Sequence, residues 1–104
     1  MSEAFEASMN FDMENVGPFL TQIDVALGLG LDVAHLVKRI EATEVETAYG
    51  TDLTVNFEGR KENLKFSAFI DDIDAPDLYF ISYNERLAAA IDEEMMSFCE
   101  AHGL

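Results

Sequence analysis

The sequence predicts a single α+β domain, in which helices pack on one face of an antiparallel sheet of about five strands. Three observations predict this class. Several short segments alternate apolar and polar residues, three others carry apolar residues at helical spacing, and the strand-like segments follow one another without a long crossover. A chain of 104 residues has the usual size of one domain, so we expect residues 1–104 to share one core.

The first part of the chain predicts one strand and two helices. Residues 4–13 alternate apolar and polar side chains, which is typical of a strand with one buried face. Residues 18–28 carry apolar residues at helical spacing, and Pro18 suits the first turn of a helix. Asp32 is a good N-cap for a second helix over residues 32–42.

The second part predicts four strands and a long helix, which gives the order β-α-α-β-β-β-β-α. Alternation returns three times and predicts a meander, over residues 45–49, 53–57 and 64–70. The polar stretches 50–52 and 59–63 would be its turns. Residues 78–81 are apolar on both faces, as in a covered strand, and Asn84 caps a final helix that ends at Gly103.

Composition and charge exclude several classes of function. The formal charge of −15 comes from 21 carboxylates against 6 Lys and Arg, which argues against direct binding to nucleic acid or to an anionic membrane. Cys99 is the only cysteine, so an intramolecular disulfide is excluded. No signal-peptide pattern or membrane-spanning run is present, and we expect a cytoplasmic domain that needs no cofactor.

The strand pattern predicts an acidic sheet face opposite the helices. Its acidic residues would be Glu6, Asp12, Glu44, Glu46 and Glu58. Carboxylates at alternate strand positions lie about 6.6–6.8 Å apart, a spacing that could imitate a nucleic-acid backbone toward a basic protein. Two plainer interpretations stay open: a solvated face that discourages edge pairing, and adaptation of the whole protein to salt.

Candidate chemistry is sparse. The aspartates between Asp71 and Asp77 could hold a hard cation, but they do not fit an EF-hand loop, and an exposed turn is the simpler interpretation. Cys99 and His102 are helical neighbours that fall on the stripe expected to face the core, which favours packing over catalysis. We therefore predict a protein that is not an enzyme and holds no metal.

The order of elements, with one strand, two short helices, a meander and a long final helix, is similar to an abbreviated helix-grip domain. That is the fold of lipid-transfer and plant-allergen pocket proteins. The resemblance is one of topology and gives no residue a binding role. It implies an alternative function, a small apolar ligand held between the sheet and the last helix. The residues that would line such a pocket are Phe57, Phe66, Phe80, Ile91 and Phe98.

Size, charge and composition also match secretion chaperones, immunity proteins that neutralise toxins, and phage-encoded inhibitors of host defence. Our leading hypothesis is therefore a binding domain, an inhibitor or neutraliser of anti-defence or immunity type, that docks on a basic protein. A nucleic-acid-binding protein would be one partner of that kind. The first contact set is Glu44, Glu46, Glu58, Asp71, Asp72, Asp74 and Asp77. A second set lies on the last helix, at Asp92, Glu93 and Glu94. Self-association as a homodimer is left open.

Overall fold

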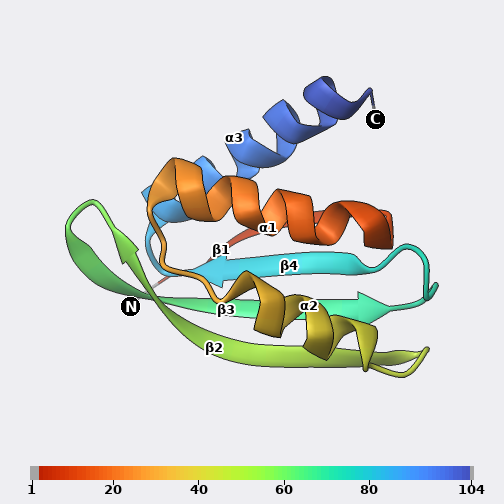
Figure 1. The fold of residues 1–104 in the computed structure, drawn as a ribbon. Coiled ribbons are helices and arrows are strands. Elements are labelled where there is room, and N and C mark those ends of the chain that lie inside the picture. Colours follow the sequence, from red (N-terminus) through yellow and green to blue (C-terminus); the bar gives the residue numbers. More distant parts are fainter. Residues whose placement is uncertain (1–2, 104) are drawn as a thin grey trace.

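The computed structural model describes residues 3–103, which form a four-stranded sheet and three helices (Figure 1). The elements in chain order are β1 (Phe5–Asn10), α1 (Met13–Leu27), α2 (Val33–Glu41), β2 (Thr47–Phe57), β3 (Arg60–Ile70), β4 (Asp77–Ser82) and α3 (Glu85–His102). The predicted α+β class with an antiparallel sheet is confirmed. The predicted number of strands is too high by one.

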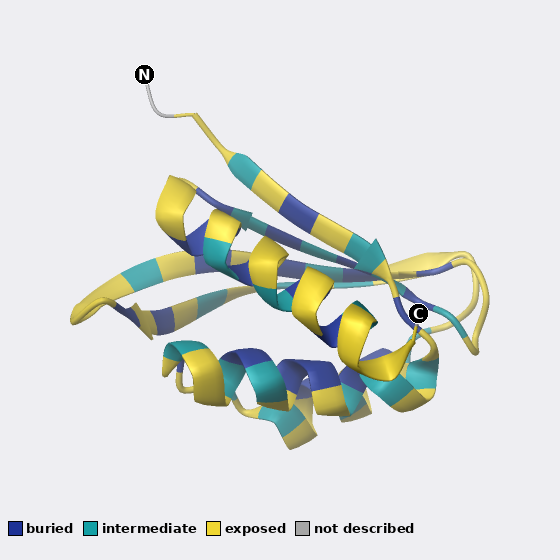
Figure 2. Cartoon of the chain, turned by 90° about the horizontal axis from the view of Figure 1, so that it is seen from above, coloured by how far each residue is buried: buried dark blue, intermediate teal, exposed yellow. Residues whose placement is uncertain are grey.

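The sheet has the order β1-β4-β3-β2, and every neighbouring pair is antiparallel. The first strand of the chain therefore pairs with the last one, and β1 and β2 form the two edges. The three helices cover one face of the sheet, and their buried segments lie on the sides turned toward it (Figure 2). The other face of the sheet has no helix over it (Figures 1 and 2).

The predicted strands 45–49 and 53–57 merge into one continuous strand, β2, which begins only at Thr47, and the predicted turn at residues 50–52 is wrong. Gly50 lies within the ladder, opposite Ser67 of β3. The hairpin turns at Glu58 and Gly59, which both have positive φ, as a two-residue type I′ turn requires. The predicted turn at residues 59–63 overlaps it but is too long, because β3 already begins at Arg60. Glycine marks turns in many sequences, and here it takes a strand position where only a small side chain faces it.

The junction between β1 and α1 also differs from the prediction. β1 ends at Asn10, and α1 begins at Met13, five residues before Pro18. Phe11 continues the apolar alternation but lies in the core after the strand, where its N–H donates to the carbonyl of Pro76 at 3.0 Å. The strand was therefore predicted about three residues too long, because Phe11 is buried in the core without being part of the ladder.

Helix ends follow the predicted caps more closely. Gly28 and Gly103 end α1 and α3 in the left-handed region, with φ of 65° and 68°. Asp32 accepts the N–H of His35 at 3.1 Å, and Asn84 accepts the N–H of Arg86 at 3.0 Å. Short-range capping chemistry was therefore readable from the sequence.

One cluster of buried apolar side chains lies between the sheet and the helices. Phe66 and Phe80 face each other across β3 and β4 with ring centroids 5.1 Å apart, and Phe19 of α1 meets Phe98 of α3 at 5.6 Å. The side chains named for an apolar pocket, Phe57, Phe66, Phe80, Ile91 and Phe98, all lie in this cluster. An apolar ligand between sheet and helix stays a prediction.

Candidate functional site

Loops and element ends gather carboxylates at one end of the molecule. We call this the acidic end and define it by Asp12, Glu14, Glu44, Glu46, Asp71, Asp72, Asp74 and Asp77. They come from the start of α1, the loop before β2 and the loop between β3 and β4, which lie together at the right of Figure 1. Six of the ten residues predicted as contacts belong to it.

Backbone hydrogen bonds fasten these segments to one another. The N–H of Met13 donates to the carbonyl of Asp74 at 2.7 Å, which joins α1 to the loop between β3 and β4. The N–H of Glu46 donates to the carbonyl of Ile70 at 2.6 Å, which joins the loop before β2 to the end of β3. The acidic end is therefore assembled by the ladder and its flanking turns.

The aspartate loop is itself ordered by side-chain hydrogen bonds. The Asp72 carboxylate accepts the N–H of Asp74 at 2.9 Å, an Asx turn of the kind that aspartate favours. The Asn10 side-chain amide donates to Asp77 at 2.9 Å and to the carbonyl of Ala75 at 2.8 Å. The loop thus presents Asp71 and Asp74 as exposed carboxylates on a fixed backbone.

No lysine or arginine lies within the three segments of the acidic end. The only ion pair in the described part of the chain joins Arg86 to Glu58, which lie elsewhere. The nearest cation along the chain, Arg39, lies over the ring of Tyr49 at 5.1 Å from its centroid. Across residues 3–103, no group of three or more acidic, histidine or cysteine side chains could hold a metal ion.

Exposed apolar side chains accompany the carboxylates. Val45 is 47% exposed between Glu44 and Glu46, and Ile73 is 60% exposed within the aspartate loop. Phe69 adds a partly exposed ring on the uncovered face of the sheet, one residue before β3 ends. Apolar side chains with a polar rim occur at protein interfaces.

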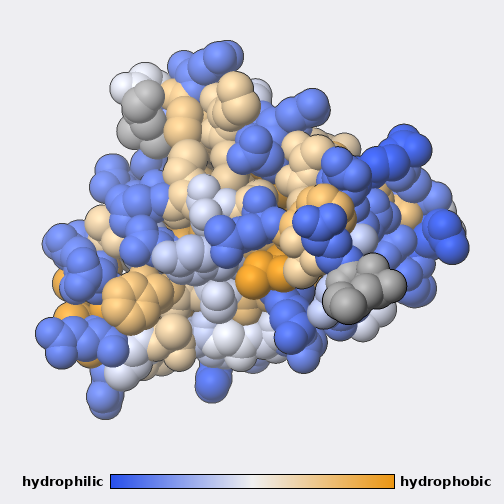
Figure 3. Space-filling model, turned by 180° about the vertical axis from the view of Figure 1, so that it is seen from behind, coloured by the Kyte–Doolittle hydropathy of each residue, from blue (hydrophilic) through white to orange (hydrophobic). Residues whose placement is uncertain are grey.

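The uncovered sheet face is not the acidic lattice that the strand pattern predicts. Asp12, Glu44, Glu46 and Glu58 lie outside the strands, and of that acidic set only Glu6 lies within one. The strand residues on this face with an exposed or half-exposed charge are Glu6, Asp52, Asp77, Lys61 and Lys65. Pale and orange atoms occupy much of its middle (Figure 3). Eight of the 21 carboxylates of the chain therefore lie at one end of the sheet, and its uncovered face carries few.

The remaining predicted contacts lie away from the acidic end. Glu58 is in the hairpin turn at the opposite end of β2. Asp92 and Glu93 are exposed on α3, and Glu94 accepts the side-chain amide of Gln22 on α1 at 3.0 Å. Glu94 therefore helps to hold two helices together.

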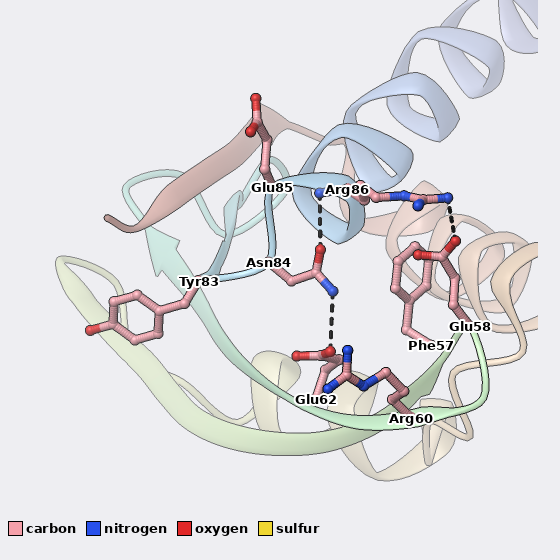
Figure 4. Close-up of a pocket in the computed structure, with 8 residues that line it drawn as sticks. All are labelled: Phe57, Glu58, Arg60, Glu62, Tyr83, Asn84, Glu85 and Arg86. Carbon is pink, nitrogen blue, oxygen red and sulfur yellow. Dashed lines mark hydrogen bonds and ion pairs between the residues drawn. The ribbon is translucent and has the colours of Figure 1, made fainter. Parts of the chain in front are cut away.

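The opposite end of the molecule, which we call the hairpin end, holds an open cleft of about 490 Å³ (Figure 4). It is lined by Phe57, Glu58, Arg60, Glu62, Tyr83, Asn84, Glu85 and Arg86. Asn84 connects its two walls, because its amide donates to Glu62 at 3.1 Å while its oxygen caps α3. Sequence reasoning missed this cleft, since Arg60 and Arg86 are 26 positions apart and share no motif.

Cys99 and His102, which are neighbours on α3, each have another contact partner in the structure. The thiol of Cys99 lies 3.2 Å from the sulfur of Met9 on β1, and His102 stacks on Phe98 with centroids 3.9 Å apart. Both side chains contact apolar partners, but the predicted core position is wrong for His102, which is exposed near the end of α3, and Cys99 is only half-buried.

Comparison of the chain with protein-family models, curated proteins and solved structures gave no match. The likeness to a helix-grip domain stays one of element order. Among the described residues, no helix combines the length and apolar character needed to cross a bilayer.

Proposed function

We propose that this protein is a non-catalytic binding domain whose acidic end docks on a basic surface of another protein, as an inhibitor or neutraliser would. The observation that carries the proposal is the meeting of three separate segments in one group of eight carboxylates that contains no lysine or arginine. A large unneutralised charge on a rigid frame steers a partner of opposite charge and makes the association sensitive to salt.

Two further features support docking on a protein. Val45 and Ile73 can bury against a partner while the neighbouring carboxylates pair with its cations. The loop that bears Asp71 and Asp74 is fixed by hydrogen bonds, so binding would lose little conformational entropy. The same carboxylates repel the phosphates of nucleic acid, so we propose no direct contact with DNA or RNA.

The test compares two quadruple charge reversals of equal size. One variant, E44K/E46K/D71K/D74K, changes the acidic end and leaves Asp72 and Asp77 to hold the loop. The control, E6K/D92K/E93K/E100K, changes β1 and the exposed side of α3. Each reversal adds two charges, so both variants have a formal charge of −7 instead of −15. Net charge alone therefore cannot distinguish them.

Tagged wild-type and variant domains would be used to capture proteins from cell extract, with elution by a salt gradient and competition by DNA. We expect a basic partner on the wild type and the control, and a loss of about tenfold or more in its affinity for the acidic-end variant. An equal loss of affinity in both variants would show that binding depends on net charge alone and would overturn the proposal. Loss in the control alone would move the contact to α3 and overturn the proposal.

A further inference from the structure

β2 leaves a row of backbone groups facing outward at the edge of the sheet. The N–H of Asn56 donates to the carbonyl of Leu29 at 2.9 Å, so the backbone of Asn56 points away from β3. Successive residues of an antiparallel strand turn their backbone groups to opposite sides. Because the register from Thr47 to Phe57 is unbroken, the outward groups continue at Ala48, Gly50, Asp52 and Thr54.

These four N–H groups point away from β3, and no acceptor outside the ladder takes a hydrogen bond from them within residues 3–103. All four residues are exposed. Proteins usually protect such an edge with proline, a bulge, short length or several charges. β2 has 11 residues with no proline and no bulge, and Asp52 is the one charge in the outward row.

The other edge of the sheet, β1, has a shorter row of outward backbone groups. β1 has only six residues, and the side chain of Asn10 at its end is engaged with Ala75 and Asp77. Continuing the alternation through β3 and β4 places the N–H of Ser8 at the centre of this outer edge. β1 therefore serves as an internal comparison for β2.

We propose that β2 accepts an extended basic segment of the partner as a fifth strand. The inference rests on the proposed function, and it adds the mode of binding. The free row from Ala48 to Thr54 spans about 20 Å, enough for a segment of about seven residues. Main-chain hydrogen bonds supply the affinity in this mode, and the side chains of alternate residues supply specificity.

Charge selects the occupant. The row begins two residues after Glu46 and contains Asp52, so a bound strand passes the acidic end and gains from lysine or arginine. On the helix side, Tyr49 and Leu53 are half-buried beside the edge and favour apolar side chains. A second copy of this chain would bring another charge of −15 to the same edge, which disfavours a β2 to β2 homodimer.

The probe is a synthetic ten-residue peptide of alternating lysine and valine, and its control carries an N-methyl group at every peptide bond. N-methylation removes the peptide N–H groups of both edges, so the control cannot add to the sheet through either edge, and it leaves the charge unchanged. We expect the plain peptide to slow hydrogen exchange at Ala48, Gly50, Asp52 and Thr54, read by NMR, with no change at Ser8. Equal binding of both peptides, or no protection along β2, would overturn the strand addition.

Two proline variants provide a second measurement. Gly50→Pro removes an outward N–H at the centre of the β2 row, and Ser8→Pro does the same on β1. We expect Gly50→Pro to weaken peptide binding about tenfold or more and Ser8→Pro to leave it unchanged, with thermal melts as a check on folding. If peptide binding responds to E44K/E46K/D71K/D74K but not to Gly50→Pro, the acidic end still docks the basic probe and only the strand addition is wrong.

Discussion

The two ends of this molecule differ in whether their carboxylates are paired with a cation. At the hairpin end, Glu58 pairs with Arg86, and Asn84 links the carboxylate of Glu62 to the start of α3. At the acidic end, eight carboxylates are brought together by backbone hydrogen bonds and an Asx turn, and no ion pair joins them. A carboxylate at the hairpin end pairs with a cation, whereas those at the acidic end form hydrogen bonds within their own segments or stay exposed without a cation beside them.

The largest expected difference between the ends concerns their aromatic anchors. Phe11 is 1% exposed and stacks on Phe19, whereas Phe57 is 8% exposed and lines the open cleft at the hairpin end. Phe11→Ala should leave a buried cavity and cost about 3–5 kcal/mol, while Phe57→Ala should cost less than about 3 kcal/mol because water can enter its site. Urea unfolding of both variants checks this, and equal losses would show that the ends are packed equally well.

The helix caps should differ next. Asn84 accepts the N–H groups of Arg86 and Leu87, so Asn84→Ala should lower the free energy of unfolding by about 1–2 kcal/mol. Asp12 stands at the N-cap position of α1 but makes no side-chain cap bond, so Asp12→Ala should change stability by less than about 0.5 kcal/mol. Thermal unfolding measures both. A large loss for Asp12→Ala would mean that the acidic end also has a structural role.

Neutralising single carboxylates should give the smallest effects, and they should have opposite signs. Glu58→Gln breaks an exposed ion pair and should cost up to about 0.5 kcal/mol. Asp71→Asn removes one of several like charges and should stabilise by a similar amount at low ionic strength. Salt at about 0.5 M should reduce both differences, because it screens exposed charges. Denaturant titrations at low and high salt would check this, and equal signs would contradict the contrast.

Local signals made most of the fold predictable. The caps at Asp32, Asn84 and Gly28 depend on neighbouring residues only, and the sequence located them within about one residue. The strand count failed at Gly50, because glycine is typical of turns and also fits a strand where a small neighbour faces it. The turn after β2 was located at Gly59 but predicted too long, because the polar residues from Arg60 to Asn63 are typical of turns and here form the start of β3.

The residues of the acidic end could be predicted from the sequence, but their proximity to one another in the fold could not. Glu44, Asp71 and Asp77 were chosen for their charge, and their meeting depends on the antiparallel register of β2, β3 and β4. The same register moved Glu58 to the opposite end. Sequence patterns give the face on which a residue lies, and only the pairing gives its position along the sheet.

The pairing of β1 with β4 has a consequence for the order of folding. β2, β3 and β4 are joined by short turns, so their contacts close small loops, whereas the pair Asn10 and Asp77 closes a loop of more than sixty residues. The entropic cost of closure rises with loop length, and non-local contacts slow folding. We therefore expect the meander to form early and β1 to join late. The first strand of this sheet to be synthesised would then be the last to pair.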